Sequence, residues 1–182
     1  PPDPRDAFDA LFDVAVAKYA PVPAATLGWL ASGLVMGAPQ WRADRTAALR
    51  RARARLDSRR VDGVDWYWPA GERIRQVELP DRVRLLAPFD PVVWDRRRFA
   101  LFWGWEYRFE AYTPAPKRVR GYYALPLLWR DAVIGWANLS VQDRRLIHET
   151  GYVSGRAPRD PAFRRALDAE LEAMRRFLGV AR

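Results

Sequence analysis

The dipeptide Asp62-Gly63 lies between two short runs that favour β-strands, at residues 58–61 and 64–68. An Asp-Gly pair in this setting is the strongest short-range signal of a two-residue β-hairpin. Three helix-like segments precede it, and the third is rich in arginine. The order helix, helix, basic helix, hairpin is that of a winged helix-turn-helix, whose third helix enters a DNA groove. We therefore expect residues 1–75 to form such a unit, with the hairpin as its wing.

The three helices are predicted from apolar spacing and from residues that stop helices. Residues 5–20 carry one apolar face, made of Phe8, Leu11, Phe12, Ala15 and Tyr19. Pro21 and Pro23 should end this helix, and Gly33 should end the second, which starts near residue 24. Asp44 is expected to cap the third helix. Its narrow apolar stripe consists of Leu49, Ala52 and Leu56.

The remaining residues, 76–182, predict a β-rich domain. Alternating or apolar runs at residues 83–90, 106–113, 120–129, 132–141 and 144–155 favour strands. Asp90 followed by Pro91 predicts the start of a helix between the first two, and Asp160 before Pro161 predicts a C-terminal helix. The expected fold is α+β: a winged helix-turn-helix, then a small curved antiparallel sheet with an inserted helix and a C-terminal helix.

The charge balance indicates a polyanionic partner. The formal net charge is +9, and Lys18 and Lys117 are the only lysines, so arginine supplies nearly all of the positive charge. Arginine presents a planar fork that suits phosphate oxygens and guanine edges. A GC-rich genome explains arginine in place of lysine, but it does not explain an excess of cations over carboxylates.

Some classes of function are disfavoured by what the sequence lacks. It has no cysteine and one histidine, His148, so we expect no metal site and no cofactor. No run approaches the roughly 18 apolar residues of a membrane span, and residues 1–10 do not resemble a signal peptide. We expect no membrane partner and a cytoplasmic location, at the bacterial nucleoid. The absence of an initial methionine suggests that the numbering begins inside a longer polypeptide.

A long segment, residues 85–129, carries a family resemblance. It contains Phe89-Asp90-Pro91, then Trp94-Asp95-Arg96, then a Pro-x-x-Lys-Arg turn from Pro114 to Arg118, and finally Gly121-Tyr122-Tyr123. This order resembles the C-terminal half of the YcaQ-like winged-helix DNA glycosylases, which repair interstrand crosslinks. The resemblance implies tandem winged helices with a β-rich C-terminal domain, and hydrolysis of the N-glycosidic bond of an alkylated or crosslinked purine.

The family's catalytic motif is Gln-apolar-Gln or Gln-apolar-Asp, in its first winged helix. The nearest sequences here are Gln40-Trp41-Arg42, which lacks the second polar group, and Gln76-Val77-Glu78, which has it but lies in a predicted linker. We therefore expect the catalytic motif outside this chain. Gln76, Glu78 and Asp90 stay as weak catalytic candidates, and a helix cap is the simpler role for Asp90. The family pattern also tends to carry an acid and a base near Asn138 and Ser140, which this chain lacks.

The predicted DNA-binding residues form two groups. One lies on the third helix and at the base of the wing: Arg45, Arg50, Arg51, Arg53, Arg55, Arg59 and Arg60. The other is the proline-braced turn and the start of the following strand: Lys117, Arg118, Arg120, Tyr122 and Tyr123. The two tyrosines should point to opposite faces of that strand, so one is core and the other is free to stack on a base or bind phosphate. A solvated helix face and a charged hairpin loop are the alternatives.

The sequence thus predicts duplex DNA binding as the C-terminal part of a DNA glycosylase. The expected partners are double-stranded DNA and an N-terminal winged-helix part of the same polypeptide. A winged-helix DNA-binding or regulatory protein without glycosylase activity is the first alternative. A protein-interaction scaffold whose charge reflects genome composition is the second.

Overall fold

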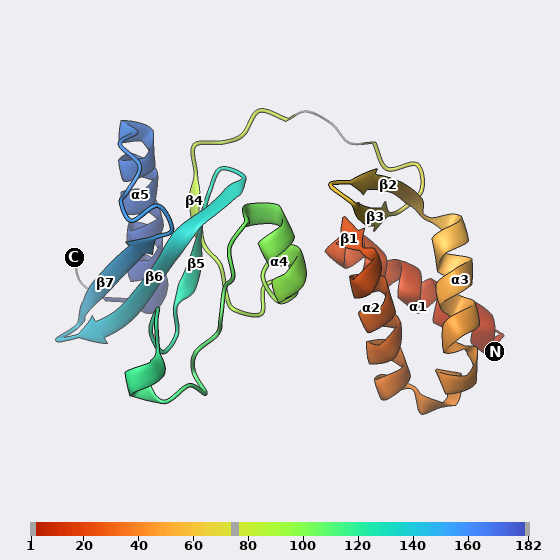
Figure 1. Cartoon of the computed structure of the whole chain (residues 1–182). Coiled ribbons are helices and arrows are strands. Elements are labelled where there is room, and N and C mark those ends of the chain that lie inside the picture. The colour runs from red at the N-terminus through yellow and green to blue at the C-terminus, as the bar shows by residue number, and fades with distance from the viewer. Residues whose placement is uncertain (1–2, 74–76, 181–182) are drawn as a thin grey trace. The chain divides into compact units, whose positions relative to one another are not determined.

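The computed structural model describes residues 3–73 and 77–180 of the chain. These divide into two compact units, Pro1–Gln76 and Val77–Arg182, and together they contain five α-helices and two antiparallel sheets (Figure 1). The expected α+β class is confirmed at this level. Within the described ranges, no helix has the length and apolar character needed to cross a membrane.

Unit 1 consists of three helices and a three-stranded sheet. Its elements are α1 (Pro4–Tyr19), β1 (Val22–Pro23), α2 (Ala24–Gly37), the 3-10 helix η1 (Pro39–Asp44), α3 (Arg45–Arg55), β2 (Asp57–Val61) and β3 (Val64–Trp68). The sheet order is β1-β3-β2. Asp62 and Gly63 both have positive φ, 49° and 79°, as the two central residues of a type I′ turn require. The predicted hairpin is therefore confirmed.

The core of unit 1 lies where the three helices meet. Phe8, Val35 and Ala48 are buried together, and Trp41 stacks on Phe8 with 4.9 Å between ring centroids. Two expectations for the helices were wrong. Leu11 is exposed while Val16 is fully buried, because the buried face of α1 follows Phe8, Phe12 and Val16 at four-residue spacing. Gly33 does not end α2, which continues to Gly37.

Unit 2 is built on a four-stranded sheet. Its elements are β4 (Val83–Leu85), α4 (Arg96–Trp103), the 3-10 helix η2 (Ala115–Lys117), β5 (Leu125–Trp129), β6 (Ala132–Gln142), β7 (Arg145–Tyr152) and α5 (Pro161–Leu178). The strand order β4-β5-β6-β7 follows the chain. Arg130 and Asp131 form the turn that joins β5 to β6. The predicted cap of α5 is confirmed, because the Asp160 side chain accepts a hydrogen bond from the Ala162 N–H.

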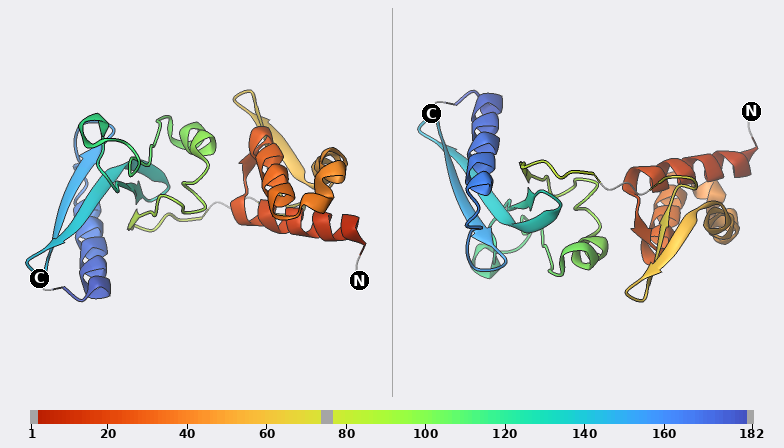
Figure 2. Two further views of the ribbon diagram at one scale, coloured as in Figure 1. Left: turned by 90° about the horizontal axis from the view of Figure 1, so that it is seen from below. Right: turned by 90° about the horizontal axis from the view of Figure 1, so that it is seen from above.

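Side chains of β5 reach both faces of this sheet. Leu127 and Trp129 pack with Phe163 of α5, whereas Leu128 packs with Phe99 of α4 and with Tyr107. Opposite faces of the sheet therefore carry the two apolar cores of unit 2, with α5 lying along the sheet in each view (Figure 2).

The inserted helix starts later than predicted. Its N-cap is Asp95, whose carboxylate accepts hydrogen bonds from the Arg97 and Arg98 N–H groups. Asp90 instead lies in a turn, where its side chain accepts from the Val92 N–H. The Arg96 guanidinium donates to the carbonyls of Pro88 and Val93. These bonds hold residues 88–93 as a turn, so the Asp90-Pro91 pair does not start the helix.

Two predicted strand segments have other structures. Residues 106–113 contain no strand, and residues 120–124 precede β5 as irregular chain. The expectation that one of Tyr122 and Tyr123 would be core was therefore wrong, because both are exposed. Glu110, in the first of these segments, is buried, with only 3% of the residue exposed.

Candidate nucleic-acid interface

The proline-braced turn of unit 2 is organised by the buried carboxylate of Glu110. One of its oxygens, Oε2, accepts hydrogen bonds from the N–H groups of Arg120 and Gly121 at 2.7 and 3.2 Å. Both oxygens lie within hydrogen-bond distance of the Val119 N–H, at 3.1 and 3.0 Å. Three successive N–H groups thus converge on one carboxylate, which fixes the backbone after the Lys-Arg pair.

These hydrogen bonds keep Glu110 ionised. Burial alone would raise the pKa of its carboxyl. The N–H groups of Arg120, Val119 and Gly121 oppose this effect, with a smaller contribution from the Arg120 charge, and the net result is a pKa below the ordinary value. The negative charge of Glu110 is therefore neutralised inside the turn by backbone dipoles and does not face solvent.

Lys117 and Arg118 remain on the surface of this turn. The Arg118 Nε donates to the Thr113 carbonyl at 2.8 Å, and its guanidinium lies over the Tyr122 ring, 4.9 Å from the centroid. No carboxylate partner of Lys117 or Arg118 occurs among residues 3–73 and 77–180. The turn therefore holds two cations whose charge is available to an external anion, one of them oriented by a carbonyl and an aromatic ring.

Arg120 differs from its two neighbours because its guanidinium is inside the unit. It lies over the rings of Trp105 and Trp136, at 5.1 and 5.4 Å from their centroids. Its carbonyl accepts a hydrogen bond from Asn138 Nδ2 at 2.6 Å. Gly121 has a φ of +123°, and a Cβ there would collide with the Asn138 side chain. Asn138 thus packs directly against the end of the turn.

Four aromatic rings beside the turn form a cluster that the sequence did not predict. Phe109 lies at its centre, in edge-on contact with Phe89, Tyr112 and Tyr123 at centroid distances of 5.4, 6.1 and 5.2 Å. The outer rings are exposed: Tyr112 by 92%, Phe89 by 68% and Tyr123 by 47%. Contiguous exposed aromatic groups on a folded domain usually mark a binding surface. We refer to these four residues as the aromatic cluster.

Two arginines of α3 in unit 1 differ from Lys117 and Arg118 because they form ion pairs. Arg51 binds Asp9 of α1 through Nε at 2.8 Å and Asp44 through NH2 at 2.6 Å. Arg55 binds Asp9 and Asp13 at 3.0 and 2.8 Å. The lack of acids within the α3 sequence is thus compensated by carboxylates of α1 and of the residue before α3. These bonds raise the pKa of Arg51, mainly through hydrogen bonding to Asp44 and Asp9.

Of the other predicted DNA-binding residues in unit 1, two bind partners within the unit and three are exposed. The Arg45 guanidinium donates to the Ser32 hydroxyl and to the Gly28 carbonyl, so it ties α3 to α2. Arg60 pairs across the hairpin with Asp65 at 3.3 Å. Arg50, Arg53 and Arg59 are exposed, and none of them has an ion pair with another described residue. Among the predicted DNA-binding residues of unit 1, these three are the cations left open to a partner.

The structure describes two of the three weak catalytic candidates. Gln76 lies outside the described residues, and Glu78 is exposed. Asp90 is held in its turn by the Val92 N–H. In the described ranges, no group of three or more histidine, cysteine, aspartate or glutamate side chains has a metal-binding arrangement.

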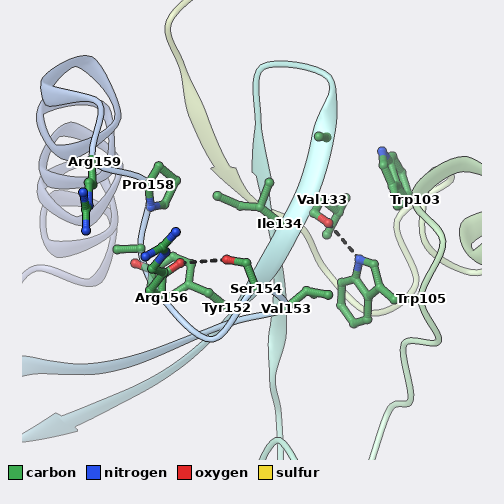
Figure 3. Close-up of a pocket in the computed structure, with 12 residues that line it drawn as sticks. Trp103, Trp105, Val133, Ile134, Tyr152, Val153, Ser154, Arg156, Pro158 and Arg159 are labelled. Atoms are coloured by element: carbon green, nitrogen blue, oxygen red, sulfur yellow. Dashed lines mark hydrogen bonds between the residues drawn. The ribbon is translucent and has the colours of Figure 1, made fainter.

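Unit 2 also contains an open pocket of about 630 Å³ near the start of β6 (Figure 3). Trp103 and Trp105 form one wall, and their indole N–H groups donate to the carbonyls of Asp131 and Val133. Arg156 lies on the opposite side, in the loop after β7. None of the residues predicted to act in catalysis or DNA binding lines this pocket.

The comparison with known families identifies the class. The family model described as DNA glycosylase AlkZ-like matches residues 1–177, which is almost the whole chain. The protein is therefore a member of a class of DNA-repair glycosylases. Within that class, it belongs to the AlkZ-like DNA glycosylase family. No solved structure matches the chain. The resemblance predicted from residues 85–129 is confirmed at the level of this family, and DNA is the partner that such a family implies.

Proposed function

We propose that this chain grips double-stranded DNA as part of a YcaQ-like glycosylase that releases alkylated or crosslinked purines. The family match over residues 1–177 carries this proposal. The element order of unit 1, with three helices, a sheet of order β1-β3-β2 and the β2–β3 hairpin, supports its assignment as a winged helix-turn-helix. The hairpin is then the wing, and α3 is the helix that faces the DNA groove.

Among the predicted DNA-binding residues, the surface cations without acidic partners are the proposed phosphate contacts. In unit 2 these are Lys117 and Arg118, which a rigid turn presents to solvent. In unit 1 they are Arg50, Arg53 and Arg59. Arg45, Arg51, Arg55 and Arg60 bind partners within unit 1, and we assign them mainly to the stability of that unit. Contacts to phosphate position a protein on DNA without reading sequence.

The catalytic glutamine motif is proposed to lie outside residues 1–182. Hydrolysis of an N-glycosidic bond requires an oriented water and oxygens that stabilise an oxocarbenium-like state. Glu78 is exposed to solvent, and the Asp90 carboxylate accepts a hydrogen bond from the Val92 N–H within its turn. Neither carboxylate therefore has an environment that suits this task. The proposed role of this chain is thus to bind and position DNA for chemistry carried by another part of the polypeptide.

Measuring duplex DNA affinity at a series of salt concentrations tests the proposed phosphate contacts. The logarithm of the binding constant should fall linearly with the logarithm of salt concentration, with a slope of about −0.9 per phosphate contact. The double variant Lys117→Ala, Arg118→Ala should bind more weakly and have a slope smaller by about 1.8. Arg175→Ala is the matched control, because Arg175 pairs with Glu172 on α5. A slope unchanged by the double variant would remove the turn from the proposed interface.

An assay of base release tests the placement of the chemistry. Incubation of the chain with alkylated duplex DNA should produce no abasic sites above the protein-free rate. Efficient base release would contradict the placement of the motif outside residues 1–182. DNA binding without base release by any longer polypeptide that contains this chain would favour the alternative, a winged-helix DNA-binding protein without glycosylase activity.

A further inference from the structure

We propose that the aromatic cluster, Phe89, Phe109, Tyr112 and Tyr123, binds unstacked bases of a single-stranded or locally opened DNA segment. The inference rests on the proposed function, because it extends the proposed binding of duplex DNA to single-stranded or opened DNA. Tyr112 and Tyr123 of the cluster lie on either side of the Lys117-Arg118 turn in the sequence. None of the four residues was considered as a catalytic candidate above.

The geometry of the rings leaves their faces accessible. The three outer rings contact Phe109 edge-on, with interplanar angles between 69° and 89°. An edge-on contact to a central ring supports the outer ring without covering both of its faces. Tyr112 is exposed by 92% and Phe89 by 68%, so these two rings offer the largest open surfaces. Every nucleobase has a flat face that can stack on such rings.

The charges around the cluster favour a nucleic acid over an apolar protein surface. Residues 108–123 place three cations at the surface, Arg108, Lys117 and Arg118, and contain one acid, Glu110. The guanidinium of Arg120 lies inside the unit and is not counted. The acid is buried and satisfied by three backbone N–H groups, so it does not repel phosphate. Aromatic side chains interleaved with exposed cations are the combination by which proteins bind single strands.

The neighbouring contact between Arg118 and Tyr122 supports the same ligand chemistry. The guanidinium lies 4.9 Å from the centroid of the Tyr122 ring, and its Nε is fixed by the Thr113 carbonyl. Tyr122 is followed directly in the chain by Tyr123 of the cluster, so a strand held at Arg118 through a phosphate can also pass the cluster. Phosphate contacts from the turn and base contacts from the cluster would then act on one strand.

A comparison of three labelled DNAs by fluorescence anisotropy tests the proposal. The DNAs are a short oligothymidine, an abasic strand of the same length and charge, and a matched duplex. We expect oligothymidine to bind about tenfold more tightly than the abasic strand. Tyr112→Ala and Phe89→Ala should each remove most of that difference and leave duplex binding unchanged. The variant Lys117→Ala, Arg118→Ala should weaken binding of all three DNAs.

The matched control is Phe177→Ala, which removes an exposed aromatic ring of α5 in the same unit. It should leave all three affinities unchanged. Equal affinity for oligothymidine and the abasic strand would overturn the inference while leaving the proposed duplex grip intact. Failure to bind any of the DNAs would overturn both proposals. Unchanged base preference in Tyr112→Ala would also reject base stacking and would favour a protein contact at this surface.

Discussion

The basic helix α3 and the basic turn before β5 both concentrate cations in a short segment but use them differently. In α3, Arg51 and Arg55 bind the carboxylates of Asp9, Asp13 and Asp44. In the turn, the one acid is Glu110, and backbone N–H groups occupy its carboxylate. Glu110 therefore forms no ion pair with an arginine side chain of the turn. Lys117 and Arg118 keep their charge for a partner.

This difference shows that a count of cations overstates the positive charge that a surface can offer. A paired arginine must exchange a carboxylate for a phosphate, whereas an unpaired one only releases water and counterions. The turn is therefore expected to contribute more to DNA affinity per cation than α3 does. The same difference predicts where a substitution will damage folding and where it will damage binding.

The largest expected effect is that of Glu110→Ala. This change removes the acceptor of three N–H groups, those of the half-buried residues Arg120 and Gly121 and that of the exposed Val119. Each unsatisfied buried donor costs about 1–3 kcal/mol, so we expect a loss of about 3 kcal/mol or more in the free energy of unfolding. Urea unfolding, followed by tryptophan fluorescence, measures the loss. Glu106→Ala, at an exposed position of the same segment, should change stability by less than about 0.5 kcal/mol.

A smaller effect is expected from acid. The folded pKa of Glu110 lies below its ordinary value of 4.5. The stability that its ionisation provides is therefore fully present above that value, and it is lost as pH falls through the folded pKa. Between neutral pH and pH 3, the wild-type chain should lose more stability than Glu110→Gln, which cannot ionise. Equal losses in the two proteins would show that Glu110 is not held in its charged form by the turn.

The next largest effect is expected from Arg51→Ala. This variant compares an arginine of α3 that forms ion pairs with one that does not. Arg51 joins α1 to the start of α3 through two carboxylates, and its side chain is 33% exposed. Its removal should destabilise unit 1 by about 1–2 kcal/mol. Arg50→Ala, at an exposed neighbour, should leave stability nearly unchanged and weaken duplex DNA binding. Thermal unfolding and anisotropy of both variants measure the two effects, and a reversed pattern would contradict the assignment.

Local signals predicted much of the fold. The Asp62-Gly63 turn fixes its hairpin through two positive φ angles that these residue types tolerate. Asp160 before Pro161 starts α5 where expected. The same Asp-Pro signal failed at Asp90, because Arg96 binds the carbonyls of that turn and Asp95 provides a competing cap. A local pattern does not reveal which of two possible caps tertiary contacts will favour.

The candidate site was predicted only in part. Lys117 and Arg118 were identified from their turn, but the burial of Glu110 was not, because its partners are backbone N–H groups 9–11 residues away. The aromatic cluster joins Phe89 to Phe109 and Tyr123, which have no regular spacing. The α3 arginines appeared unopposed because two of their acids, Asp9 and Asp13, lie on α1, 42 residues before Arg51 in the case of Asp9.

The smallest expected effect is that of Arg60→Ala in the hairpin, and it sharpens the contrast between paired and unpaired cations. Arg60 pairs with Asp65 at 3.3 Å, but the Arg60 side chain is 68% exposed. Exposed pairs contribute little to stability, so the free energy of unfolding should fall by less than about 0.5 kcal/mol. Asp65→Ala frees Arg60 for phosphate and should raise duplex affinity, mainly at low salt. Salt-dependent anisotropy of both variants measures this, and unchanged affinity in Asp65→Ala would indicate that the hairpin does not touch DNA.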